Sequence, residues 1–109
     1  MGRVGSMLIL IVSISGHPDA VRGLRGISSA SVKRGHSVII FFTGDGVNHL
    51  REEGMLNKLS SMGVRLLACR TSARERKVAL EGTLREVVEI SSLSMLVELL
   101  ETCDRALFL

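Results

Sequence analysis

The chain has 109 residues, 46% of them hydrophobic and 23% charged, and carries a formal net charge of +3. This length suits one packed core, so we expect residues 1–109 to form a single domain, and the composition excludes a disordered or collagen-like chain. Aromatic residues make up only 3% of the chain, with no Trp or Tyr. The stacking platforms of single-strand binding proteins are therefore missing, and we expect no direct contact with nucleic acid.

The chain begins with a short basic segment and an apolar run. MGRVGS matches the M-G-x-x-x-S pattern of N-myristoylation, which carries little information. Residues 7–14, MLILIVSI, are too few to span a bilayer and are not followed by the cleavage pattern of a signal peptide. Their apolar side chains do not alternate with polar ones, which is typical of a strand buried on both faces of a parallel sheet. We therefore expect a central strand here and no association with a membrane.

The residues after this strand predict an amphipathic helix. Gly16 suits a turn, and Pro18 suits the first turn of a helix. Leu24 and Ile27 follow at helical spacing, and Gly35 suits the position just after a helix end.

Strands and helices continue to alternate through the rest of the chain. The predicted elements are a strand at 37–42, a helix that includes 55–62, a strand at 64–69, a helix at 72–80, a strand at 86–91, a helix at 92–103 and a strand at 105–109. Thr71 or Ser72 is the expected N-cap of the helix at 72–80, and Ser92 or Ser94 that of the last helix. This alternation predicts right-handed crossovers. We therefore expect an α/β fold of the flavodoxin or Rossmann kind, with a mainly parallel five-stranded sheet between helices in three layers.

Four polar residues follow the predicted strands at their carboxyl ends, where open parallel sheets bind ligands. His17 follows the first strand, Asp45 and His49 follow the second, and Cys69 ends the third. We expect them to approach one crevice, with His17, Asp45 and His49 as rim residues. His36 precedes a strand, so it lies at the opposite ends of the strands from the other candidates, and we exclude it from the site.

Cys69 lies where an apolar strand ends and a basic segment begins, in VRLLACRTSARERKV. If it directly precedes a helix, backbone N–H groups stabilise its thiolate, and Arg70 and Arg74 add positive charge. Arg70 and Arg74 are also candidates for binding an anion, because guanidinium groups suit persulfide, phosphate or carboxylate partners. The alternatives are a buried, unreactive cysteine and a solvated basic helix surface. Cys103 lacks basic neighbours and is expected to be structural.

Two other kinds of site are only weakly indicated. The GDG sequence at 44–46 resembles the start of a phosphate-binding loop, but neither nucleotide motif is complete, so a tight turn that requires positive φ is the better interpretation. His17, His49 and Cys69 lack the spacing of a zinc site. We therefore expect neither a metal nor a cofactor.

Three segments resemble the DsrE/DsrF-like sulfur-relay family, which includes the small Tus proteins of tRNA thiolation. They are DAVRGLRGISSASVKRGHSVIIFFTGDGV, LNKLSSMGVRLLACRTSARERK and VVEISSLSMLVELLETCDRALFL. The resemblance implies a parallel α/β domain that assembles into homo- or hetero-oligomers, commonly trimers or hexamers. It also implies that the cysteine matched by Cys69 carries sulfur as a persulfide and passes it to a partner protein. Many relatives have a second cysteine three residues later, where this chain has Ser72, but persulfide transfer requires only one thiol on each partner.

The sequence and the resemblance together predict a sulfur carrier rather than a turnover enzyme. Cys69 is its expected persulfide site, exposed enough to deliver sulfur, and its partners are sulfur donor and acceptor proteins. Two separated cysteines suit the reducing cytoplasm. The apolar segments LSMLVELL and ALFL require covering, which favours self-association. The alternatives are a non-catalytic oligomeric module that binds a small anion or a nucleotide through the arginines and the GDG turn, and a structural subunit whose cysteine is inert.

Overall fold

Five parallel strands form the centre of the molecule. The computed structural model describes residues 5–109, so the first residues of the myristoylation pattern and of the expected domain lie outside the described part. The strands are β1 (Leu8–Ser13), β2 (Ser37–Phe42), β3 (Arg65–Cys69), β4 (Val88–Ser91) and β5 (Arg105–Phe108). Their order is β4-β3-β2-β1-β5, and every neighbouring pair is parallel. The parallel five-stranded sheet expected from the sequence is therefore confirmed.

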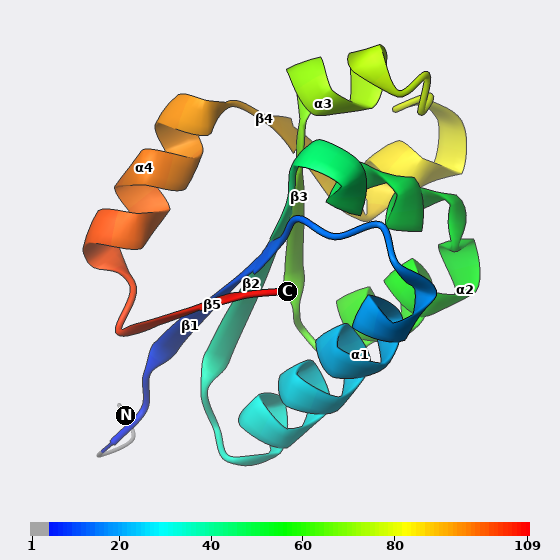
Figure 1. Ribbon diagram of the computed structural model, residues 1–109. Coiled ribbons are helices and arrows are strands. Elements are labelled where there is room, and N and C mark those ends of the chain that lie inside the picture. Colours follow the sequence, from blue (N-terminus) through cyan, green and yellow to red (C-terminus); the bar gives the residue numbers. More distant parts are fainter. Residues whose placement is uncertain (1–4) are drawn as a thin grey trace.

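Helices cover both faces of this sheet, but unequally. The helices are α1 (Pro18–Lys33), α2 (Glu53–Ser61), α3 (Arg70–Glu75) and α4 (Leu93–Thr102), with 3₁₀ helices η1 (Gly44–Arg51) and η2 (Gly82–Glu86). Figure 1 shows α1 and α2 on one side of the sheet and α4 on the other. The predicted α/β arrangement of a sheet between helices is thus present. None of the helices within residues 5–109 is long and apolar enough to cross a membrane.

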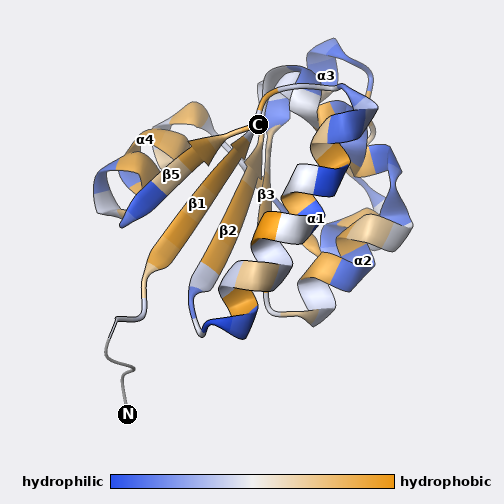
Figure 2. Cartoon of the chain, turned by 60° about the horizontal axis from the view of Figure 1, so that its bottom comes forward, coloured by the Kyte–Doolittle hydropathy of each residue, from blue (hydrophilic) through white to orange (hydrophobic). Residues whose placement is uncertain are grey.

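The two faces of the sheet have separate hydrophobic clusters. Successive strand side chains point to opposite faces, so Ile11 of β1 and Ile40 of β2 belong to the larger cluster, which includes Leu24 of α1. Val12 and Phe41 belong to the smaller cluster beneath α4. The central strands β1 and β2 are hydrophobic along most of their length, as Figure 2 shows, because both of their faces are covered.

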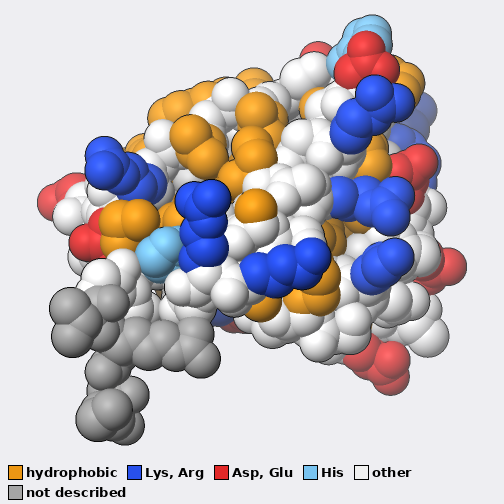
Figure 3. Space-filling view, turned by 90° about the horizontal axis from the view of Figure 1, so that it is seen from below, with side chains coloured by type: hydrophobic (Ala, Val, Ile, Leu, Met, Phe, Trp, Pro, Cys, Tyr) orange, Lys and Arg blue, Asp and Glu red, His pale blue; other side chains and the backbone are white. Residues whose placement is uncertain are grey.

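Helices α1 and α2 are amphipathic. Their inner residues, such as Leu24 and Leu59, are buried, while Figure 3 shows basic side chains beside hydrophobic ones on the underside of the molecule. The predicted starts of two helices also agree with the structure. Pro18 lies in the first turn of α1, and Ser92 is the N-cap of α4, where its side chain accepts a hydrogen bond from the Met95 N–H.

The helix predicted at 72–80 is wrong in its position. The structure has a six-residue helix, α3, that starts at Arg70, so Cys69 rather than Thr71 or Ser72 occupies the N-cap position. The helix ends early because Lys77 adopts a positive φ of 55°. The N–H of Val78 then bonds to the carbonyl of Ala73, and the N–H of Lys77 bonds to that of Arg74. This is the Schellman pattern, which usually has glycine at the left-handed position.

Candidate functional site

Cys69 is the last residue of β3, and its side chain belongs to the hydrophobic cluster beneath α4. Only 3% of the residue is exposed. The expectation of a thiol exposed enough to deliver sulfur is therefore not met in the single chain. The physical reason is the strand register, which pairs Cys69 with Ser91 of β4 and gives it the same orientation as Leu67.

The surroundings of Cys69 lower the pKa of its thiol. Burial by itself raises the pKa, because a thiolate is poorly solvated in the protein interior. Hydrogen bonds from the Ser72 hydroxyl, the Ser72 N–H, the Thr43 hydroxyl and the Thr71 N–H act in the opposite direction and together outweigh burial. The Cys69 side chain makes no hydrogen bond short enough to count as a helix cap, but these donors favour its anionic form. The net result is a thiol that ionises more readily than an ordinary one.

Ser72 connects this site to the turn after β2. Its Oγ accepts a hydrogen bond of 2.9 Å from the Gly44 N–H and lies 3.3 Å from the Thr43 Oγ1. A hydroxyl has one proton to donate and two lone pairs to accept with. Gly44 occupies one lone pair, and the single Ser72 proton serves either the Thr43 Oγ1 or the Cys69 sulfur, whose anionic form it stabilises. The β2 turn therefore orients the hydroxyl that stabilises the thiolate.

Neither Ser72 nor Thr43 was predicted from the sequence as a site residue. Ser72 was considered only as a helix cap and as the residue that replaces a cysteine. Ser72 could have been found from its position three residues after Cys69, because the third residue of a helix lies next to the N-cap residue. Thr43 had no comparable local signal, since the pairing of β2 with β3 brings it beside Cys69.

The three expected rim residues each have a local partner. The Asp45 carboxylate accepts a hydrogen bond of 2.8 Å from the Arg76 Nε. His49 is buried, with its Nε2 at 2.8 Å from the Ser15 carbonyl oxygen. The exposed His17 is the N-cap of α1, and its Nδ1 accepts a hydrogen bond from the Asp19 N–H. None of the three is among the groups that shift the pKa of Cys69.

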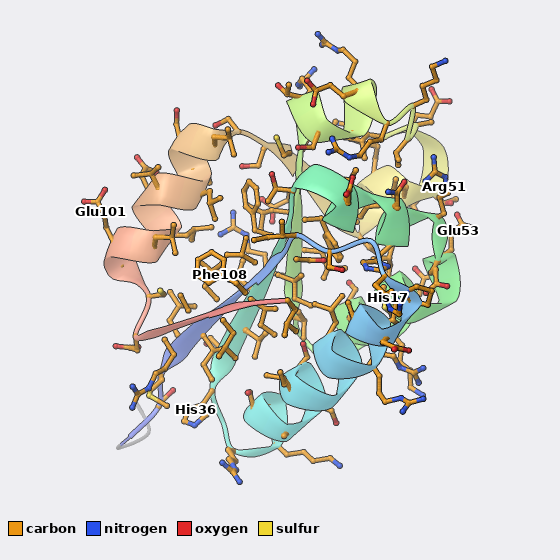
Figure 4. The ribbon with its side chains drawn as sticks, in the orientation of Figure 1. His17, His36, Arg51, Glu53, Glu101 and Phe108 are labelled. Carbon is orange, nitrogen blue, oxygen red and sulfur yellow. The ribbon has the colours of Figure 1, made fainter. Side chains whose placement is uncertain are left out.

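The remaining candidates of the sequence analysis are spread over the molecule. Arg70 and Arg74 are both exposed on α3, whereas Arg76, the C-cap of this helix, pairs with Asp45. Figure 4 places His36 at the far end of α1 from His17, where its Nδ1 accepts a hydrogen bond from the Met7 N–H. Among residues 5–109, no three or more His, Cys, Asp or Glu residues are grouped to hold a metal ion.

The GDG turn has the conformation expected of a tight turn. Gly44 adopts a positive φ of 54°, which glycine tolerates best. A Cβ at Gly46 would lie 2.0 Å from the Ser13 carbonyl oxygen, because η1 packs directly against the end of β1. The two glycines thus bring the β2 turn close to the sheet, where it holds Thr43 and Ser72.

Comparison with known proteins places this chain in a family. The model of the DsrE/DsrF-like family matches residues 6–109. The structure resembles the ychN protein from E. coli, with a TM-score of 0.67 and 15% identity over 95% of this chain and 99% of that one. It also resembles BT1422, a conserved protein of unknown function from Bacteroides thetaiotaomicron, with a TM-score of 0.76 and 17% identity over 94% of both chains. No curated protein matches at the level of sequence. Because the family model spans nearly the whole chain, the protein belongs to the DsrE/DsrF-like family.

Proposed function

We propose that this protein is a sulfur carrier that holds a persulfide on Cys69. Membership of the DsrE/DsrF-like family is consistent with sulfur relay. The observation that carries the proposal is the lowered pKa of the Cys69 thiol, which arises from the donors of Ser72, Thr43 and Thr71. A thiolate is the form of cysteine that attacks sulfur, so a lowered pKa raises the reactive fraction near neutral pH.

The loading step is a thiolate exchange at sulfur. The Cys69 thiolate attacks the outer sulfur of a donor persulfide, and a new S–S bond forms as the donor S–S bond breaks. The donor leaves as a thiolate, and the transferred sulfur becomes the terminal atom of the Cys69 persulfide with its proton. Delivery is the same exchange with the thiolate of an acceptor protein as the attacking group. No oxidant and no second cysteine is required.

Burial of Cys69 places a condition on both steps. With 3% of the residue exposed, a donor reaches the sulfur only when the structure around it opens. Helix α3, which lies directly after Cys69, has six residues, and such short elements open at low cost in free energy. We propose that α3 or the neighbouring β2 turn moves when a donor or acceptor docks. A buried thiol in the reducing cytoplasm is also protected from non-specific oxidation.

We further propose that the chain assembles with copies of itself or with related chains, as a trimer or a hexamer. Large hydrophobic side chains remain exposed on α4, on β5 and after β1, and we refer to them as the α4–β5 surface: Ile14, Leu93, Val97, Leu100 and Phe108. Strand β5 is also at the edge of the sheet, with free backbone groups along one side. Several large exposed hydrophobic side chains on neighbouring elements typically mark a protein interface.

Persulfide loading of three proteins tests the proposed function. The wild-type chain, Cys69→Ser and Cys103→Ser are each incubated with glutathione persulfide, and the intact mass is measured. We expect the wild type and Cys103→Ser to gain one sulfur atom and Cys69→Ser to gain none, while circular dichroism shows all three folded. Loading that persists in Cys69→Ser, or that follows Cys103, contradicts the assignment. An unloaded but folded wild type favours the structural or anion-binding alternatives.

A further inference from the structure

Helices α1 and α2 form a groove that has no part in the Cys69 site. Its volume is about 540 Å³, which lies within the range of roughly 300 to 1,000 Å³ that is typical of small-molecule sites. Its lining residues come from these two helices and from Met62, the C-cap of α2. The groove is on the side of the larger hydrophobic cluster, whereas Cys69 belongs to the smaller cluster beneath α4.

The floor of the groove is apolar. Val21 of α1, Met55 and Leu59 of α2, and the C-cap residue Met62 line it. Met55, Leu59 and Met62 are spaced by about one turn, so they form a continuous stripe along the helix and its end. Two methionines give this stripe unbranched, adaptable side chains that accommodate different apolar shapes.

The rim of the groove is positively charged. Arg22 and Arg25 border it on α1, and Lys58 borders it on α2; Figure 3 shows basic side chains beside hydrophobic ones on this face. Within residues 5–109 none of the three forms an ion pair, and none of the described lining residues is acidic. Three like charges around one apolar floor repel each other, and an anion held between them relieves that repulsion.

Gly26 keeps the groove open. It lies within α1, where glycine costs about 1 kcal/mol relative to alanine. A Cβ at Gly26 would have no neighbour within 4 Å, whereas one at Gly23 would meet the Leu109 side chain at 3.3 Å. Packing therefore accounts for Gly23 but not for Gly26. The missing side chain at Gly26 leaves space between the arginines and the apolar floor.

We propose that this groove binds a small amphipathic anion, with a carboxylate or phosphate head on a short apolar body. The head lies between Arg22, Arg25 and Lys58, and the body lies along Met55 and Leu59. Charge complementarity carries the proposal. A purely apolar ligand would leave Arg22, Arg25 and Lys58 without a negatively charged partner, whereas an anion pairs with them. The proposal does not depend on the role of Cys69, so each can fail without the other.

Titration of the full-length, isotope-labelled chain with octanoate and octyl phosphate tests this site, with backbone NMR as the readout. We expect saturable shifts confined to α1 and α2. Arg25→Gln should weaken binding about tenfold, as expected for loss of a charge-assisted hydrogen bond. Lys33→Gln removes the same charge from α1 outside the groove and should leave the affinity unchanged. Octanol, which has the same chain without the charge, should bind at least tenfold more weakly.

Gly26→Leu provides a second test that does not depend on charge. The change replaces a helical glycine with a strong helix former on an exposed face, so the fold should persist, and the new side chain should fill the groove and abolish the shifts. Equal binding of octanol and octanoate, or unchanged affinity in Gly26→Leu, overturns the proposal. Shifts that appear only with an acidic amphipathic peptide also overturn it, because they assign the groove to a helix of a partner protein.

Discussion

The two faces of the sheet are covered by very different amounts of structure. Helices α1 and α2 and both 3₁₀ helices contribute buried residues to the larger cluster, whereas α4 alone covers the smaller one. Most large hydrophobic residues that remain exposed lie on α4, at Phe108 of β5 and just after β1, whereas Leu107 of β5 points to the other face. The face of the smaller cluster is therefore the less completely covered of the two. Cys69 belongs to this less completely covered face.

The largest effect is expected where the covered face is most tightly packed. Gly46→Ala places a Cβ 2.0 Å from the Ser13 carbonyl oxygen, and both groups belong to backbone that cannot move independently. We expect a loss of about 4 kcal/mol or more in the free energy of unfolding, measured by urea denaturation. Gly54→Ala in α2 is the control, since its Cβ would meet nothing within 4 Å. A loss below about 1 kcal/mol in Gly46→Ala would contradict the close packing of η1 on β1.

Truncating one side chain on each face sharpens the comparison. Leu24 of α1 is fully buried, while Val97 of α4 is 54% exposed. Leu24→Ala should cost about 3 kcal/mol through the cavity that it leaves, and Val97→Ala should cost less than about 0.5 kcal/mol under conditions where the chain is monomeric. Denaturant unfolding at low protein concentration measures both. Similar losses in the two variants would show that α4 is as well covered as α1.

Charging the α4–β5 surface tests whether it is an interface. The double variant Val97→Asp/Phe108→Asp places two carboxylates on side chains that are both more than half exposed. We expect self-association to weaken about a hundredfold, measured by sedimentation equilibrium, with little change in monomer stability. Asn57→Asp on α2 adds a charge to the other face and should leave assembly unchanged. A wild-type chain that stays monomeric, or a double variant that assembles normally, contradicts the proposed interface.

The smallest effect is expected from the ion pair at the start of β3. Arg65 donates to Glu89 of β4 through two hydrogen bonds of 2.6 and 2.8 Å. The pair lowers the pKa of Glu89 and raises that of Arg65, chiefly through these hydrogen bonds. Both side chains are about half exposed, at 43% and 53%, so solvent screens the pair and Glu89→Gln should cost less than about 1 kcal/mol.

The pH dependence of this ion pair follows from the lowered pKa of Glu89. The carboxylate binds its proton less readily in the folded state, so the pair stabilises the protein above the unfolded-state pKa of glutamate. That contribution is lost as the pH falls through the folded-state pKa. Unfolding of the wild type and of Glu89→Gln should therefore converge at acidic pH, and a difference that grows on acidification contradicts this assignment.

Local sequence patterns predicted most of the fold. The strands at 37–42 and 105–109 and the cap at Ser92 were recoverable because buried strands and N-caps have local signatures. The end of α3 was missed because Lys77, not glycine, occupies the left-handed position. The 3₁₀ helix η1 was missed because its geometry depends on the contact of Gly46 with Ser13, which is distant in sequence.

The candidate site was only partly predictable. Cys69 was identifiable from its place at the end of an apolar run, and its ionisation tendency agrees in direction with that prediction. The reason differs, because hydroxyl and backbone donors, rather than Arg70 and Arg74, are the groups that lower its pKa. Burial of Cys69 was only the alternative interpretation of the sequence, since the register of β3 against its neighbours decides which face the thiol takes. Contacts between strands set these features, and no local pattern encodes them.

The central claim is that Cys69 is an activated thiol held by Ser72, and the pH dependence of its alkylation tests that claim most directly. Iodoacetamide labelling of the native wild type and of Ser72→Ala is followed by peptide mass at Cys69 and Cys103 separately. We expect the Cys69 midpoint of the wild type to lie below that of an ordinary thiol and to rise in Ser72→Ala, because the variant loses a donor to the thiolate. Cys103 should keep the same profile in both proteins. A Cys69 midpoint at or above the ordinary value, unchanged by Ser72→Ala, would contradict the account and identify an inert buried cysteine.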